Sequence, residues 1–137
     1  MRDKKTHRKF LVSGRPTLCV MIKSRVTADI IRDIKLAIEE GCDAFGLQIE
    51  SMSPECKTKS DFCDIFDAME DKPAYVTDYT RGCTKSAADD EYLAEELILA
   101  LECGGDLIDI RGDMFYPTPG EMTFNPLAVE KQISLIK

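Results

Sequence analysis

The chain has 137 residues, of which 44% are hydrophobic and 31% are charged, a composition typical of one folded domain rather than a disordered segment. No run of 18 apolar residues occurs and no apolar segment follows the charged N-terminus, so we expect neither a membrane-spanning helix nor a secretory signal. Residues 1–16 hold six Lys and Arg against one Asp, and the acidic remainder argues against a nucleic-acid surface. We therefore predict a cytoplasmic protein with a basic N-terminal arm, residues 1–16, expected to be a solvated tail, and one domain, residues 17–137.

Four apolar, strand-like runs recur along this domain at intervals of 27 to 33 residues, and a helix-like stretch follows each run. We expect parallel strands over residues 17–22, 44–50, 73–77 and 106–110. The interval is that of the strand–helix unit in a (β/α)₈ barrel, where about 250 residues make eight units. The pattern predicts an α/β fold of parallel units of TIM-barrel type, with about four of the eight units present: a half-barrel.

The intervening helices are marked by apolar stripes at helical spacing and by stop signals. In the first, Thr27 is the expected N-cap, Asp29 lies in the first turn and Gly41 supplies the stop. The third is expected to run from Asp89 or Asp90 to Cys103. Asn125 is expected to cap a fourth helix that reaches Lys137 without a stop signal. Inward-facing positions are predicted at Ile30, Ile31, Ile34, Ala37, Ile38, Phe62, Ile65, Phe66, Met69, Leu93, Leu97, Ile98 and Leu101.

The second strand-like run alternates between bulky and small or polar residues. One face of the strand carries the bulky residues Phe45, Leu47 and Ile49, which suit packing under helices. The opposite face carries small and polar residues that suit a barrel interior: Ala44, Gly46, Gln48 and Glu50. A half-barrel leaves two strand edges and an inner face uncovered, so we expect a homodimer or a complementing C-terminal half. A flavodoxin-like open sheet with helices on both faces is the competing fold, and solvent exposure of Ala44, Gly46 and Gln48 would discriminate.

Charged and polar residues gather where the predicted strands end, which is where parallel α/β folds place their reactive groups. They are residues 23–25, 48, 50, 78–81 and 111–113. This mixture suits a small anion such as a hydroxy-acid carboxylate, although solvated loop charges are the commoner explanation. Lys23 is the only lysine at a strand end and would form a Schiff base only if desolvated.

The sequence offers little for metal or nucleotide chemistry. Its six cysteines lack C-x-x-C spacing and its only histidine is His7, so we expect buried free thiols and no zinc site. Glycine-rich phosphate loops and the serine-hydrolase elbow are absent from the sequence. We predict no metal and no cofactor.

Several segments, in this order, resemble the first half of type I 3-dehydroquinate dehydratases, and more closely a divergent bacterial branch of that family. They are PTLCVMIKSRVTADIIRDIKLAIEEGCDAFGLQIE, KPAYVTDYTRG, GGDLIDIRGDMF and FNPLAVEKQISLIK, and the similarity runs from about Pro16 to Lys137. The resemblance implies an aldolase-like (β/α)₈ barrel that dehydrates 3-dehydroquinate to 3-dehydroshikimate without a metal, through an imine on a lysine and with a histidine as acid and base. In the family these two residues lie on the fifth and sixth strands, so this chain alone is expected to be inactive.

The resemblance also implies a substrate-binding set, in which this chain departs from the family. Where the family has Glu-x-Arg-x-Asp on its second strand, this chain has Gly46, Gln48 and Glu50. Tyr79 stands where a family arginine is expected, with Arg81 close enough to substitute, and Arg111 stands in place of a glutamate. The residues expected to bind the substrate are Gln48, Glu50, Tyr79, Arg81 and Arg111. Because they depart from the residues of the family, the substrate is not necessarily dehydroquinate. The alternative function is a non-catalytic homodimeric scaffold or small-anion-binding protein.

Overall fold

The structure is a computed structural model that describes residues 2, 8–79 and 87–109, with side chains in the last range from Tyr92 onward. Four parallel strands form one sheet in the order β1-β2-β3-β4, so that each strand pairs with its neighbours in the sequence. The strands are β1 (Cys19–Ile22), β2 (Ala44–Gln48), β3 (Ala74–Thr77) and β4 (Leu107–Ile108). This confirms the prediction of an α/β fold with an all-parallel sheet that alternates with helices.

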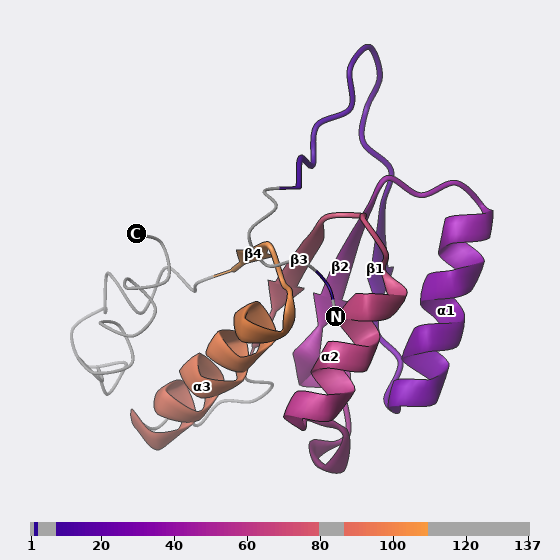
Figure 1. Cartoon of the computed structure of the whole chain (residues 1–137). Helices are drawn as coiled ribbons and strands as arrows, with labels where there is room; N and C mark the ends of the chain where they lie inside the picture. The colour runs from indigo at the N-terminus through magenta and orange to yellow at the C-terminus, as the bar shows by residue number, and fades with distance from the viewer. Residues whose placement is uncertain (1, 3–7, 80–86, 110–137) are drawn as a thin grey trace.

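Three helices connect the strands (Figure 1). They are α1 (Thr27–Glu39), α2 (Lys59–Ala68) and α3 (Ala87–Cys103), and the short 3₁₀ turns η1 (Ile49–Ser51) and η2 (Pro54–Cys56) follow β2. Thr58 caps α2 by accepting a hydrogen bond from the Asp61 backbone N–H at 3.2 Å. Gly41 has a φ of +85°, which fits the glycine stop expected after α1.

Some boundaries differ from those expected from the sequence. Thr27 is not an N-cap: the cap is Val26, which makes no side-chain cap bond, while the Thr27 hydroxyl donates to Asp61 Oδ1 on α2 at 2.7 Å. The first strand begins at Cys19 rather than residue 17, because the Leu18 N–H donates to the Asp43 carboxylate at 2.8 Å instead of joining the ladder. The expected fourth helix lies outside the described residues.

A single hydrophobic core joins all three helices to one face of the sheet. In register across the strands, Ile22, Leu47 and Val76 form one row of this face, and each is 3% exposed or less. The helices cover it with fully or almost fully buried residues: Ile30, Ile34, Phe62, Ile65, Phe66, Leu97 and Ala100. Figure 1 shows α1, α2 and α3 side by side in front of the sheet. The helix-facing predictions on α1 and α2 are therefore confirmed for these residues, whereas Ile98 and Leu101 of α3 are only half-buried.

The opposite face of the sheet carries small, polar and partly exposed residues. Met21, Gly46, Tyr75 and Leu107 are neighbours in register on it, and Met21 and Leu107 are 41% and 51% exposed. A Cβ at Gly46 would lie 2.1 Å from the Met21 sulfur, so Met21 covers this glycine. Gly46 and Ala44 are buried without any described helix on this face, so their exposure does not separate the two folds weighed from the sequence.

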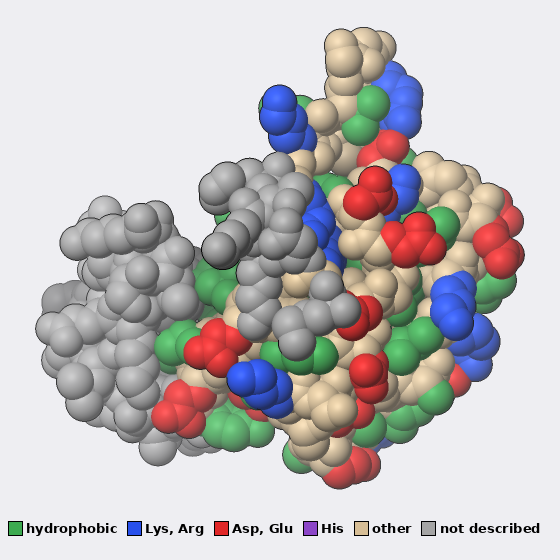
Figure 2. Space-filling model, viewed as in Figure 1, with side chains coloured by type: hydrophobic (Ala, Val, Ile, Leu, Met, Phe, Trp, Pro, Cys, Tyr) green, Lys and Arg blue, Asp and Glu red, His purple; other side chains and the backbone are tan. Residues whose placement is uncertain are grey.

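Two arginines of the basic N-terminal arm, Arg2 and Arg8, are held against the domain, whereas Lys9, Leu11 and residues 13–16 are exposed as expected of a solvated tail. Arg2 and Arg8 pair with opposite oxygens of Asp106 at 3.2 and 3.0 Å, and all three side chains are largely buried. Arg15 holds Asp43 with two hydrogen bonds of 2.6 and 2.7 Å. Asp106 and Asp43 precede β4 and β2, so the arm's arginines lie at the amino end of the sheet; Figure 2 shows basic side chains along this segment.

Two further expectations concern the thiols and the membrane. Five cysteines are free within the described residues; Cys42 and Cys103 are buried as expected, whereas Cys19 is exposed on the edge strand. Although Cys19 is exposed, partial burial of its thiol raises the pKa of this group. Within the described part of the chain, no helix is long and apolar enough to cross a membrane.

Candidate functional site

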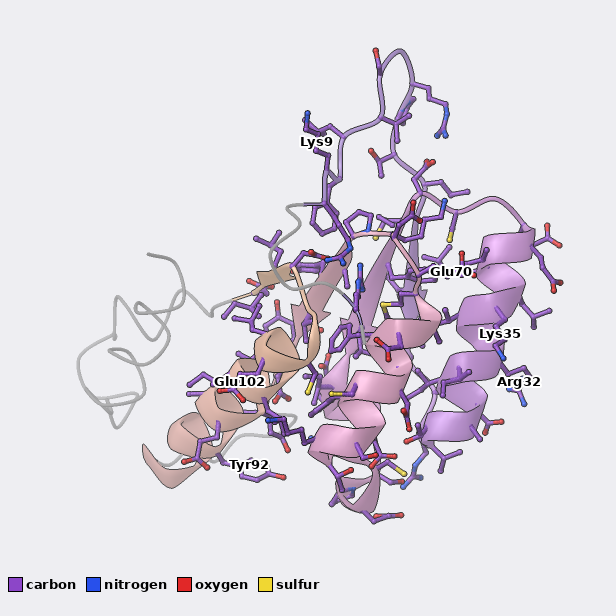
Figure 3. All side chains as sticks on the ribbon, viewed as in Figure 1. Lys9, Arg32, Lys35, Glu70, Tyr92 and Glu102 are labelled. Atoms are coloured by element: carbon purple, nitrogen blue, oxygen red, sulfur yellow. The ribbon has the colours of Figure 1, made fainter. Side chains whose placement is uncertain are left out.

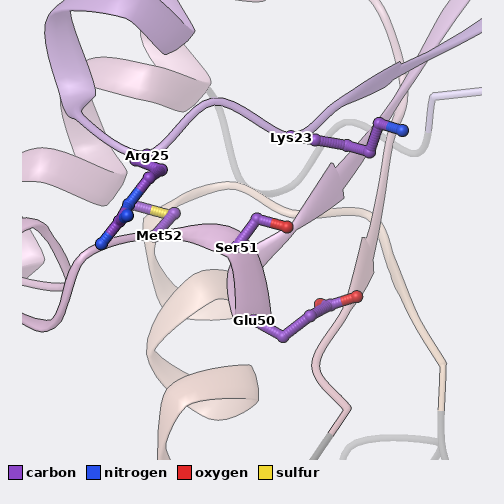
Figure 4. A pocket seen from close by; sticks show the side chains of 5 residues that line it. All are labelled: Lys23, Arg25, Glu50, Ser51 and Met52. Carbon is purple, nitrogen blue, oxygen red and sulfur yellow. The ribbon is translucent and has the colours of Figure 1, made fainter. Parts of the chain in front are cut away.

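A polar pocket of about 350 Å³ lies at the carboxyl end of the sheet, beyond the ends of β1 and β2. Its walls come from two segments: Lys23 and Arg25 follow β1, and Glu50, Ser51 and Met52 follow β2. Figure 4 shows Lys23 and Glu50 extending toward the same side of this pocket. It lies at the edge where parallel α/β folds bind their ligands.

Local structure explains how these side chains come together. After Gln48 the chain turns into the 3₁₀ helix η1 instead of continuing as a strand, and the Met52 N–H donates to the Ile49 carbonyl at 2.9 Å. The Ser53 N–H donates to the Arg25 carbonyl at 2.9 Å, which ties the loop after β2 to the loop after β1. Met52 is 5% exposed and forms part of the core below the pocket. The backbone of the pocket is therefore fixed by secondary structure and by buried packing.

The charges of the pocket favour an anion. Lys23 and Arg25 are exposed cations, and Glu50 is the single carboxylate in the lining. Glu50 is half-buried, and its carboxylate accepts a hydrogen bond from the Thr77 hydroxyl of β3 at 3.2 Å. Lys23 and the Ser51 hydroxyl can bind a carboxylate, and Glu50 can accept a hydrogen bond from a ligand hydroxyl. Arg25 extends toward the other side of the pocket (Figure 4).

A second polar cluster lies around β3 and β4, whereas the pocket lies beyond the ends of β1 and β2. Asp109, which follows β4, accepts hydrogen bonds from the hydroxyls of Tyr75, at 2.8 Å, and Tyr79. Burial and the bond to this carboxylate raise the pKa of Tyr75 to about 12. Tyr75 shares its row of the sheet with Gly46, so the cluster lies on the face that the helices leave uncovered.

The structure brings only part of the predicted site together. Glu50 joins Lys23 in the pocket, and Gln48 ends β2 as a half-buried residue. Tyr79 is instead bonded to Asp109, and the pocket lining does not include it. Arg81 and Arg111 lie outside the described residues.

Three residues of these clusters were not expected from the sequence to belong to a site: Ser51, Thr77 and Asp109. For Thr77 a signal existed, because Tyr75 and Thr77 alternate with the buried Ala74 and Val76 in the third strand. Ser51 carried no such signal, because it enters the lining through the 3₁₀ turn. Among the described residues, no group of three or more His, Cys, Asp or Glu side chains could hold a metal ion.

Comparisons of the chain with protein-family models, with curated proteins and with solved structures each found no match.

Proposed function

We propose that the protein binds a small hydroxylated monocarboxylate at the pocket formed by Lys23, Arg25, Glu50, Ser51 and Met52. The observation that carries this proposal is that a cation, a held carboxylate and a hydroxyl, those of Lys23, Glu50 and Ser51, line one pocket at the carboxyl edge of a parallel sheet. A ligand carboxylate at Lys23 gains a charge-assisted hydrogen bond, and a ligand hydroxyl finds an acceptor in Glu50. Arg25 extends to the other side of the pocket and adds positive charge there (Figure 4).

Glu50 narrows the class of ligand. A second carboxylate on the ligand would lie near this side chain, and like charges at such distances repel. A neutral sugar would leave the two cations without a partner. We therefore expect one carboxylate and at least one hydroxyl on a compact ring or chain, which is the chemistry of a hydroxy acid.

The proposed architecture is four units of a (β/α)₈ barrel of the type I 3-dehydroquinate dehydratase class. Strands in chain order, with all three described helices packed on one face, are what a barrel wall requires, whereas a doubly wound sheet reverses its strand order. The resemblance of the sequence to that family supports the same assignment. Within the described sheet, β1 and β4 each pair on one side only, so the proposal includes a second copy or a complementing half that closes these edges.

We expect this chain alone to bind rather than to dehydrate. An imine-forming lysine must be desolvated to be a free amine near neutral pH, and Lys23 is exposed. Treatment with 3-dehydroquinate and borohydride should leave the mass of the protein unchanged. A stable adduct at Lys23 would show that the lysine does chemistry and that the binding-only proposal is wrong.

Binding is tested by calorimetric titration with 3-dehydroquinate as the probe. Replacing Lys23 and Arg25 together by Gln should weaken binding by roughly tenfold or more, because it removes a charge-assisted hydrogen bond at Lys23 and the positive charge of Arg25. The matched control replaces Arg32 and Lys35 of α1, two exposed cations on a different surface (Figure 3), and should leave the affinity unchanged. Succinate, a dicarboxylate without hydroxyls, should bind more weakly than the probe. Equal loss in both double variants would mean that only the net charge matters and would refute a specific pocket.

The closing of the sheet edges is tested separately by sedimentation. A homodimer at micromolar concentration, or a complex with a complementing half-barrel, is the expected state. A stable monomer that still binds the probe would refute this part of the proposal and leave the anion site standing.

A further inference from the structure

Two buried carboxyl groups meet between β3 and α3, outside the lining of the anion pocket. Asp78 follows the last residue of β3 and is 3% exposed, and neither of its carboxylate oxygens has a hydrogen-bond donor among the described residues. Glu96 of α3 is 6% exposed, and one of its oxygens, Oε1, likewise has no donor in the described part of the chain. The two carboxyl groups are close enough for a side-chain hydrogen bond, which requires a proton on one of them.

Among the described residues, one cation pairs with these carboxyl groups. The Lys57 ammonium, just after η2, lies 2.7 Å from Glu96 Oε2, and both side chains are nearly buried. The other described titratable groups that face the pair add no positive charge: Tyr92 lies against Glu96 on α3, and Glu50 of η1 acts on Asp78. Two ionised carboxylates would therefore leave one buried negative charge that no described cation compensates, which is unfavourable in a protein interior.

We propose that Asp78 and Glu96 share one proton at neutral pH, that this proton joins β3 to α3, and that α3 opens from the sheet more readily as the pH rises, because the open form releases the proton. In the shared form, one acid O–H donates to the other carboxylate, and Lys57 compensates the remaining charge. An oxygen that lacks a donor thus gains one. A pocket of about 220 Å³ lined by Lys57, Tyr92 and Glu96, together with Pro54, Glu95 and Leu99, gives the proton a route to water.

The electrostatics of the pair agree with this geometry. Burial, followed by the hydrogen bond and the charge of Glu96, raises the pKa of Asp78 far above its usual range. Opening of α3 would expose Asp78 to water and return its pKa to about 4. Between these two values the closed form holds a proton that the open form has lost, so the closed form becomes less stable as the pH rises.

The first test needs only the wild-type protein. Carboxyl ¹³C signals followed by NMR as a function of pH report the charge of each side chain directly. The proposal predicts an Asp78–Glu96 pair that carries one proton at pH 7. Two fully ionised carboxylates at pH 7 would overturn it.

The second test measures opening of α3 by amide hydrogen exchange, with α1 as the internal reference. From pH 6 to pH 8 the protection of α3 relative to α1 should fall about tenfold per pH unit, the slope of one linked proton. Asp78→Asn replaces the protonated acid by a neutral isostere and should abolish the slope. Asp64→Asn, an exposed carboxylate on α2, should preserve it. If the protection of α3 relative to α1 does not change with pH in the wild type, or changes as steeply in Asp78→Asn, the proposal is contradicted. If Asp78→Asn does not fold, the carboxyl titration of the wild type decides.

Discussion

Replacing Asp106 by Asn should destabilise the protein far more than replacing any surface aspartate. Asp106 receives Arg2 and Arg8 and also accepts the Ala74 N–H at 2.8 Å. The Arg2 and Arg8 side chains are 2% and 8% exposed, and burial lowers the pKa of Arg2 to about 10, which indicates that its charge is poorly solvated. Removing one partner of a buried ion pair costs about 3–5 kcal/mol. Because the Asn carbonyl still accepts from Ala74, we expect about 3 kcal/mol, near the lower end of that range.

The control for this prediction is an aspartate–arginine pair of similar length that is exposed to solvent. Asp29 pairs with Arg32 at 2.6 Å on α1, but the two side chains are 46% and 61% exposed. Asp29→Asn should therefore cost at most about 0.5 kcal/mol. Urea unfolding of the two variants at pH 7 gives both free energies, with the denaturant slope as a check on two-state behaviour. Equal and small losses would refute the account in which the N-terminal arm is held by buried ion pairs.

The remaining predictions concern the core and acid stability. Phe66→Ala should lower the free energy of unfolding by about 3–5 kcal/mol, because this side chain is fully buried and packs near Phe62, with ring centroids 6.5 Å apart. As a control, Leu36→Ala, at a site 53% exposed, should change the free energy of unfolding by less than about 0.5 kcal/mol. The Arg15 guanidinium and the Leu18 N–H hold the pKa of Asp43 well below its usual range, so this pair stabilises the fold above about pH 4 and its contribution is lost as the pH falls below that. Arg15→Gln should therefore reduce the loss of stability measured by urea unfolding between pH 6 and pH 3, and an unchanged loss would contradict the assignment.

The alternation in the second strand predicted the layering of the fold correctly. Phe45 and Leu47 are fully buried in the core, as the two-residue period of a strand requires when one face packs under helices. The alternation also placed Glu50 on the opposite face, but as part of a strand. Glu50 instead reaches the pocket through the 3₁₀ turn η1, and the segment after this turn is bonded to the loop after β1 through Ser53 and Arg25. No local sequence pattern signals this turn.

The ion pairs and the buried acids could not be predicted from local patterns. Arg2 and Asp106 are 104 residues apart in the sequence, and only the folded sheet brings the arm to the start of β4. Asp78 appeared as one of several charges after the third strand. Its burial follows from the packing of α3 against β3, which brings Glu96 next to it, while Lys57 reaches Glu96 from the segment after η2.

The central claim is that the carboxyl edge of the sheet binds a hydroxylated monocarboxylate, and amide chemical-shift mapping tests it most directly. Titration with 3-dehydroquinate should move the backbone signals of residues 23–25 and 50–52 along one saturable curve, and the double substitution of Lys23 and Arg25 by Gln should abolish these shifts. Shifts centred on the Arg2–Arg8 cluster at the opposite end of the sheet, or an absence of saturable shifts at residues 23–25 and 50–52, would contradict the account.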